Sequence, residues 1–203
     1  MRPGPTPTTG GVGIGTVALF TDNSFVASDW SATKITDDQG SGAFAVSQPA
    51  AGGNPTSYRH LRHDWSGPGS ILTVHLHNGA VYNPAEKGAI LTVNVSFDLR
   101  LFEGGSSNAV NYLPLLVQNG TYYRVPRLSS AVDNNWETFS YENLAASDWV
   151  RLSGPGPENP DFSAGGGPIQ FGYVASNGRS MAGSTATESG MDNWFVLVFS
   201  SLF

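Results

Sequence analysis

The chain has 203 residues, a formal charge of −6 and no cysteine, and only 13% of its residues are charged. These values exclude disulfides, thiol catalysis and cysteine-ligated zinc, and an acidic chain without a basic run is a poor ligand for nucleic acid or an anionic membrane. No stretch reaches the roughly 18 apolar residues that a membrane span needs, so we expect no membrane insertion.

Residues 1–15 are rich in Pro, Thr and Gly and predict a flexible tail. Residues 16–203 predict one domain, because short apolar or alternating segments follow one another, separated by Gly, Pro and Asn turns. Only 143–148 has the pattern of a helical turn. The expected strands are 17–25, 30–36, 43–48, 58–65, 70–77, 89–101, 115–118, 121–123, 136–141, 168–175 and 193–199.

Three of these segments carry clear signals. Asn119-Gly120 supplies the two positive-φ residues of a tight hairpin turn. The last strand, 193–199, is apolar on both faces, so we expect it to be central or covered. Within 89–101 the side chains alternate with a period of two, which predicts one buried face made of Leu91, Val93, Val95, Phe97 and Leu99. The whole pattern predicts an all-β fold, a jelly-roll-like β-sandwich of two antiparallel sheets.

All four histidines lie within residues 60–77. A hairpin with its turn at 66–69 would place His60 opposite His75 and Tyr58 opposite His77, on one surface. Imidazoles grouped in this way bind zinc or copper, bond sugar hydroxyls, or simply lie on a polar face, and the sequence leaves all three open. The same hairpin would turn its other side chains to the core: Leu61, His63, Trp65, Leu72, Val74 and Leu76.

Aromatic residues make up 11% of the chain. Rings of Trp and Tyr stack on the apolar faces of sugars, while most aromatic side chains in a sandwich are core. The candidates for ligand contact are those in or beside polar stretches: Tyr58, Tyr82, Tyr112, Tyr122, Tyr123 and Trp136. Together with His60, His75 and His77 they form the predicted ligand-binding set.

Five short phrases recur together in a known family: FVASDW at 25–30, GGNP at 52–55, PLLVQNG at 114–120, PIQFGY at 168–173 and GMDNW at 190–194. With them the chain resembles, over about residues 17–199, an uncharacterised family of bacterial exported domains that is often found in proteins with surface-sorting signals. The resemblance implies a secreted or cell-surface bacterial protein. It implies no established activity or catalytic residue.

The last phrase is also similar to the final strand of jelly-roll carbohydrate-binding modules and their concanavalin-like relatives. In those proteins an aspartate before this strand often binds a structural calcium, which implies that role for Asp192. The first and last strands of a jelly roll commonly lie side by side, so we expect Asp22 and Asn23 to approach Asp192, with loop carbonyls completing the calcium shell. The alternative is that Asp192 only accepts hydrogen bonds from the turn backbone.

These observations predict an extracellular, non-catalytic module that binds a polysaccharide or cell-surface glycan. One alternative is a subunit of an extracellular filament or surface coat, in which Gly10–Gly15 and the apolar residues 17–20 add a strand to a neighbouring copy. A second alternative is a glycosidase or polysaccharide lyase on the same fold. The chain has no Gly-x-Ser-x-Gly motif, and no residue is predicted to be catalytic.

Overall fold

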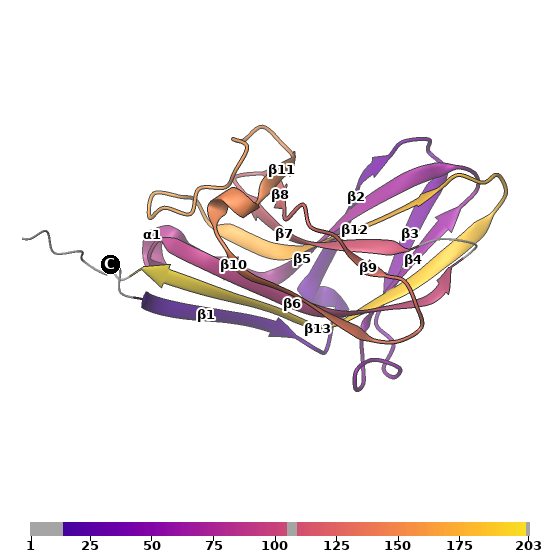
Figure 1. The fold of residues 1–203 in the computed structure, drawn as a ribbon, viewed down its shortest axis with the longest axis horizontal. Coiled ribbons are helices and arrows are strands. Elements are labelled where there is room, and N and C mark those ends of the chain that lie inside the picture. Colours follow the sequence, from indigo (N-terminus) through magenta and orange to yellow (C-terminus); the bar gives the residue numbers. More distant parts are fainter. Residues whose placement is uncertain (1–13, 105–108, 202–203) are drawn as a thin grey trace, which may run out of the picture.

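The computed structural model describes residues 14–104 and 109–201, which form two antiparallel sheets packed face to face (Figure 1). Sheet A contains β1 (Ile14–Asp22), β3 (Gly42–Ser47), β4 (Arg59–Trp65), β6 (Ile90–Gly104), β10 (Glu137–Leu144) and β13 (Thr185–Ser201). Sheet B contains β2 (Trp30–Asp37), β5 (Gly69–Tyr82), β7 (Val110–Gln118), β8 (Thr121–Arg124), β9 (Ser129–Ala131), β11 (Val150–Ser153) and β12 (Ile169–Arg179). The predicted all-β sandwich is therefore confirmed.

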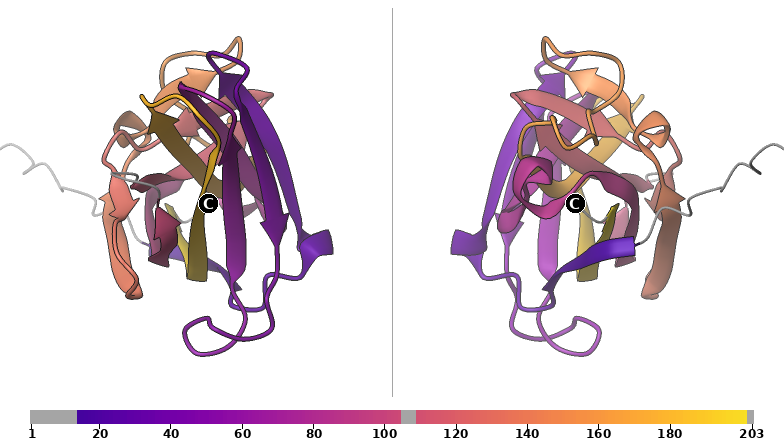
Figure 2. Two further views of the ribbon diagram at one scale, coloured as in Figure 1. Left: turned by 90° about the vertical axis from the view of Figure 1, so that its right-hand side faces the viewer. Right: turned by 90° about the vertical axis from the view of Figure 1, so that its left-hand side faces the viewer.

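Helices are few and short: η1 (Ala27–Asp29), α1 (Pro84–Lys87) and η2 (Ala146–Asp148), the last within the predicted helical turn. Within the described ranges, none of them has the length and apolar character of a membrane span. Figure 2 shows that the loop between β3 and β4 projects from one end of the sandwich. This loop borders the site described below.

β13 lies in the middle of sheet A, whose order is β10-β6-β13-β4-β3. Its first half pairs with β4 and its second half with β1, while β6 runs along its other side. The prediction that the last strand is central is confirmed, and this position explains why both of its faces are apolar.

The N-terminal predictions are only partly covered by the structure. Of the predicted tail, residues 1–13 lie outside the described residues, while Ile14 and Gly15 belong to β1. The strand that we expected to be added to a neighbouring copy pairs instead with its own chain, since residues 17–20 lie opposite 196–199 of β13. Self-assembly therefore stays a prediction.

The core lies between the two sheets and follows the alternation read from the sequence. The hairpin turn is also confirmed, since Asn119 and Gly120 have φ of 51° and 75° between β7 and β8. Leu91 is only half-buried. The other four residues of the predicted face are buried: Val93, Val95, Phe97 and Leu99.

The predicted hairpin of β4 and β5 is wrong, because β4 belongs to sheet A and β5 to sheet B. The turn between them crosses from one sheet to the other, and the neighbouring β2–β3 connection holds it there. Ser41 donates its hydroxyl to the Pro68 carbonyl (2.6 Å), and Asp38 accepts the N–H of Ser70 (2.6 Å). A short Gly-Pro turn does not reveal whether it joins strands within a sheet or between sheets.

This crossing changes which residues of β5 face the core. Thr73 and His75 point inward, where the Thr73 hydroxyl lies 2.9 Å from His75 Nε2. The apolar residues expected in the core with Leu61 lie instead on the outer face of sheet B: Leu72, Val74 and Leu76.

Candidate functional site

The outer face of sheet A carries a row of polar and aromatic side chains because β4 alternates strictly. Its inward side chains belong to the core and include Leu61 and Trp65. Its outward side chains follow Tyr58, which immediately precedes the strand, and are His60, Arg62 and Asp64.

An aromatic platform, defined as Tyr58, Phe102 and Trp136, lies at one end of this row. The ring centroid of Tyr58 lies 5.1 Å from that of Phe102 and 5.6 Å from that of Trp136. The ring centroids of Phe102 and Trp136 are 6.0 Å apart. The three rings cover Gly190 of β13, because a β-carbon there would lie 2.8–2.9 Å from an atom of each ring. Phe102 and Trp136 are half-buried, so part of each ring faces solvent.

Polar contacts fix the platform. The Arg100 guanidinium carbon lies 4.6 Å from the Phe102 ring centroid, and the same guanidinium donates to Asn134 Oδ1 at 2.8 and 3.0 Å. Trp136 Nε1 donates to the Gly52 carbonyl of the loop after β3 (3.2 Å). Burial raises the pKa of the Tyr58 hydroxyl, although the nearby Arg100 opposes this, so Tyr58 is neutral.

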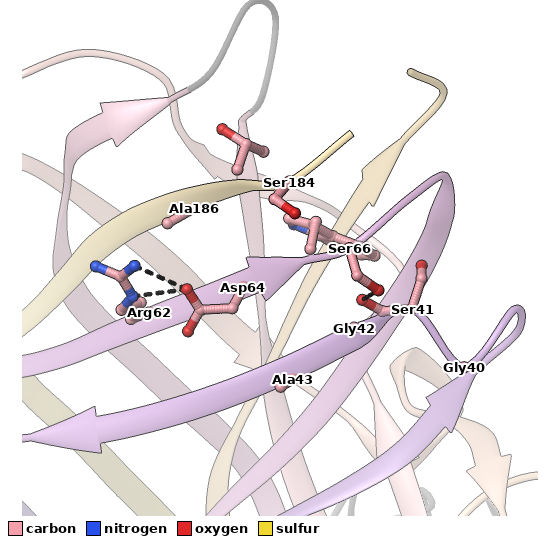
Figure 3. Close-up of a pocket in the computed structure, with 11 residues that line it drawn as sticks. Gly40, Ser41, Gly42, Ala43, Arg62, Asp64, Ser66, Ser184 and Ala186 are labelled. Carbon is pink, nitrogen blue, oxygen red and sulfur yellow. Dashed lines mark hydrogen bonds and ion pairs between the residues drawn. The ribbon is translucent and has the colours of Figure 1, made fainter. Parts of the chain in front are cut away.

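A polar row, defined as His60, Glu188, Arg62 and Asp64, continues from the platform along β4 and β13. His60 Nε2 lies 3.3 Å from one Glu188 oxygen, and Arg62 Nη1 donates to the other at 2.6 Å. Arg62 Nε also donates to Asp64 Oδ1 at 2.8 Å. Arg62 and Asp64 also line a hollow of about 600 Å³ (Figure 3), whose other lining residues include Gly40, Ser41, Ser66 and Ser184.

Three of the predicted ligand-binding residues thus come together: Tyr58, His60 and Trp136. Their neighbours Phe102, Arg100 and Glu188 were not predicted, because their proximity depends on how β6 and β13 pair with each other. The sequence signal that could have pointed to them is Gly190, whose lack of a side chain leaves room for the rings.

The predicted histidine surface does not form. His75 is buried between the sheets, with its ring stacked on Tyr173 at 4.4 Å, and burial lowers its pKa well below 6.5, so it is neutral. His77 stacks on Trp194 at 5.4 Å, accepts the N–H of Gly79 and lies 3.8 Å from an Asp22 oxygen. Both therefore lie away from His60, and placing all three on one hairpin face was wrong because β4 and β5 do not pair.

Three predicted tyrosines are part of the core. Tyr82 donates to the carbonyl of Gly88 (3.0 Å), and the hydroxyl of Tyr112 lies 2.8 Å from that of Ser189. Tyr123 is also buried. These three rings present no face to solvent for stacking.

The outer face of sheet B differs in character from that of sheet A. Its centre is apolar and consists of Val74, Leu113, Leu115 and Val174, which are themselves buried beneath neighbouring side chains. Tyr122, of the predicted aromatic candidates, lies at its margin. This face is less suited to bonding hydroxyl groups than the face with the polar row.

The predicted calcium ligands lie at one end of the sandwich but have different partners. Asp22 pairs with Trp194 in the β1–β13 ladder, two residues beyond Asp192, as the jelly-roll argument expected. The Asp22 carboxylate accepts hydrogen bonds from Ser24, Phe25 and the Trp30 indole (2.6–2.8 Å). Burial opposes its ionisation, but these bonds outweigh burial and hold the pKa of Asp22 below its usual value.

Asp192 is 1% exposed, and its two oxygens accept the N–H groups of Asn193 (2.7 Å) and Asn54. Burial raises its pKa, with the charges of Asp98 and Asp22 adding to the effect. Asn23 is exposed, and its carbonyl accepts the Ser57 hydroxyl (3.1 Å).

Three oxygens, one of them from Asp192, pack closely against Gly53. A β-carbon on Gly53 would lie 2.5 Å from the Ser57 carbonyl oxygen, 2.6 Å from Asp192 Oδ2 and 2.7 Å from the Thr56 carbonyl oxygen. A carboxylate with backbone carbonyls is a donor set that suits calcium. Asp192 and the two carbonyls are thus oxygens of the kind that calcium binds, although Asp192 and the Thr56 carbonyl already accept backbone N–H groups. The Asp22 carboxylate accepts four hydrogen bonds. No three His, Asp or Glu side chains in the described ranges are grouped as a metal site.

This architecture defines the class of fold: it is the β-sandwich found in carbohydrate-binding modules. One similar solved structure is the C-terminal family 22 module of Clostridium thermocellum Xyn10B (13% identity, TM-score 0.51, covering 91% of this chain and 96% of that chain). Another is the family 11 module of the cellulosomal cellulase Lic26A-Cel5E of the same organism (12% identity, TM-score 0.50, covering 93% and 98%). No family model and no curated protein sequence matches the chain, so the likeness defines its fold alone.

Proposed function

We propose that this domain is a non-catalytic, extracellular module that binds a polysaccharide or cell-surface glycan on the outer face of sheet A. The observation that carries the proposal is the aromatic platform beside a polar row on one exposed face. The two similar solved structures named above are carbohydrate-binding modules, which supports the same class of ligand.

The two parts of this face suit the two kinds of surface on a sugar. The solvent-facing parts of Phe102 and Trp136 can stack on the C–H face of a pyranose. Arg62 donates hydrogen bonds, while Glu188 and Asp64 accept them, as sugar hydroxyls require. The platform and the polar row together follow the chain from Tyr58 to Asp64, six residue steps or ~20 Å at the usual strand rise, which favours a chain of sugars over a single unit.

Binding is favoured over hydrolysis by the pairing of the acidic residues in the polar row. A glycosidase needs one carboxyl group that donates a proton and a second that acts as base or nucleophile. Glu188 and Asp64 both pair with Arg62, at 2.6 and 2.8 Å. One guanidinium therefore holds both carboxylates, an arrangement that suits hydrogen bonding to a ligand better than the separate acid and base of a glycosidase.

We also infer that Asp192 and the carbonyls of Thr56 and Ser57 hold a structural calcium ion. The support is that these three oxygens lie close together around Gly53, and that the charges of Asp98 and Asp22 oppose ionisation of Asp192, an effect that a cation would relieve. Trp136 connects this loop to the platform by donating to the Gly52 carbonyl, and Asn54 connects it to β6 by donating to Asp98 (2.9 Å). The ion would thereby stabilise the loop that holds the platform.

A glycan array followed by calorimetric titration tests the proposed function. The wild-type protein should bind at least one polysaccharide class, and Trp136→Ala should weaken that binding by about 2 kcal/mol, roughly 30-fold, as expected for an aromatic anchor. Tyr122→Ala on the outer face of sheet B is the matched control and should bind like the wild type. A loss in Tyr122→Ala with full binding by Trp136→Ala would move the site to sheet B, and no glycan binding at all would refute the proposal.

A further inference from the structure

We propose that a cavity between β2 and β3 binds a small organic carboxylate through Arg59. This site is separate from the aromatic platform and polar row, because Arg59 points between the sheets while Tyr58 and His60 point outward. It does not depend on the proposed glycan site.

Arg59 is a buried cation, with only 5% of its surface exposed. Its Nε donates to the Tyr173 hydroxyl (3.0 Å), Nη2 lies 3.4 Å from His75 Nδ1, and the guanidinium carbon is 5.0 Å from the Trp30 ring centroid. Nη1 has no hydrogen-bond partner among residues 14–104 and 109–201. Nη1 of Arg59 is therefore still available to donate hydrogen bonds to a ligand.

No negative group compensates this charge within the part of the chain that the structure describes. None of the ion pairs found there includes Arg59. Its two polar neighbours are neutral: burial and Arg59 itself keep the pKa of His75 well below 6.5, and burial raises the pKa of Tyr173 to about 12. Arginine stays charged even when buried, and buried charges in proteins are normally paired.

A cavity of about 190 Å³ leads to this guanidinium from the edge of the sandwich. At roughly 30 Å³ per water molecule it has the volume of about six waters, which admits a carboxylate on a few carbon atoms but not a polysaccharide chain. Ser47 and Gln48 contribute exposed polar groups to its rim. The remaining lining residues are Phe25, Ala27, Trp30, Ala32 and Val46.

The shape and chemistry of this cavity select the ligand class. A carboxylate can accept two parallel hydrogen bonds from a guanidinium and would neutralise the charge of Arg59. The apolar lining around Trp30 and Val46 suits the short carbon body of an organic acid. The carboxylate can belong to a short free acid or to a single sugar acid, and the experiment below separates these sources.

Calorimetric titration with sodium acetate and with sodium glucuronate, at constant ionic strength maintained with chloride, tests the proposal. The wild-type protein should give saturable binding and a higher melting temperature with a carboxylate than with chloride alone. Binding of acetate but not glucuronate would identify a short free acid, and tighter binding of glucuronate would identify a sugar acid. Absence of saturable binding for both, or equal stabilisation by chloride, would overturn the proposal.

Two variants locate the site. Arg59→Met removes the charge but keeps the length of the side chain, and should abolish carboxylate binding. Ala32→Leu fills the cavity without touching the charge, so it decides the question if Arg59→Met does not fold, and should lower affinity at least tenfold. Ala45→Leu, an exposed position on the outer face of β3, is the matched control and should bind like the wild type. Undiminished binding by Ala32→Leu would place the ligand elsewhere.

Discussion

Gly190→Ala is a sharp perturbation of the aromatic platform, because it adds a single methyl group beneath all three rings. The new carbon would lie 2.8–2.9 Å from atoms of Phe102, Tyr58 and Trp136. Since non-bonded carbons normally lie ~3.5–4.0 Å apart, each ring must move by about 1 Å. We expect the rings to be pushed toward solvent and out of their mutual contact.

The expected cost follows from this geometry. Overpacking costs about 1–3 kcal/mol in a closed core, and the platform is half-open, so we expect about 1 kcal/mol of lost stability in urea unfolding. Displacing the stacking surface should weaken glycan binding by about tenfold, or ~1.4 kcal/mol.

Gly178→Ala provides the control, because it is the same substitution in a strand that has room for it. A β-carbon on Gly178 would meet its nearest neighbour at 3.8 Å, an ordinary contact. This variant should differ from the wild type by less than about 0.5 kcal/mol in stability and should bind equally well. If Gly190→Ala matched Gly178→Ala in both assays, the platform would not be the glycan-binding surface.

Three further substitutions test the rest of the account. Burial lowers the pKa of His63 to about 4, so His63 takes up a proton near pH 6.5 in the unfolded protein but not in the folded protein. The stability contributed by neutral His63 is therefore full above pH 6.5 and falls toward pH 4. In urea unfolding, the free energy of unfolding of the wild type should fall between pH 7 and pH 5, and His63→Leu should fall by about 2 kcal/mol less. An unchanged pH dependence in His63→Leu would contradict this. Asp22→Asn replaces an acceptor of four hydrogen bonds with a group that is partly a donor, and should cost about 2–3 kcal/mol in the same assay; wild-type stability would be the opposing result. A chelator should lower the melting temperature of the wild type but not of Asp192→Ala, whereas an unaffected wild type would remove calcium from the account.

Much of the fold could be predicted because alternation and turn chemistry act locally. The period of two in 89–101 and the Asn119-Gly120 turn are each decided by neighbouring residues, and both are confirmed. The crossing between β4 and β5 was missed because strand pairing is decided by contacts distant in sequence. Ser41 and Asp38, some 30 residues earlier, hold that turn.

The candidate site was less accessible to sequence reasoning for the same reason. Tyr58 and His60 alternate with core residues on one strand, so their shared outward face could be predicted. Trp136, which immediately precedes β10, joins them only because β10 pairs with β6 and β6 pairs with β13, and no local pattern encodes these pairings. Arg59 was not singled out, since a charged residue at the start of a strand gives no local sign that it is buried.

A nuclear magnetic resonance titration with the glycan selected on the array tests the central claim most directly. The account predicts that the indole N–H signal of Trp136, assigned through Trp136→Phe, shifts together with backbone signals of His60, Glu188 and Arg62. Signals of Tyr122 and Arg124 on the outer face of sheet B should stay in place. Shifts confined to Tyr122, Arg124 and their neighbours, with Trp136 unmoved, would contradict the assignment of the glycan-binding face to sheet A.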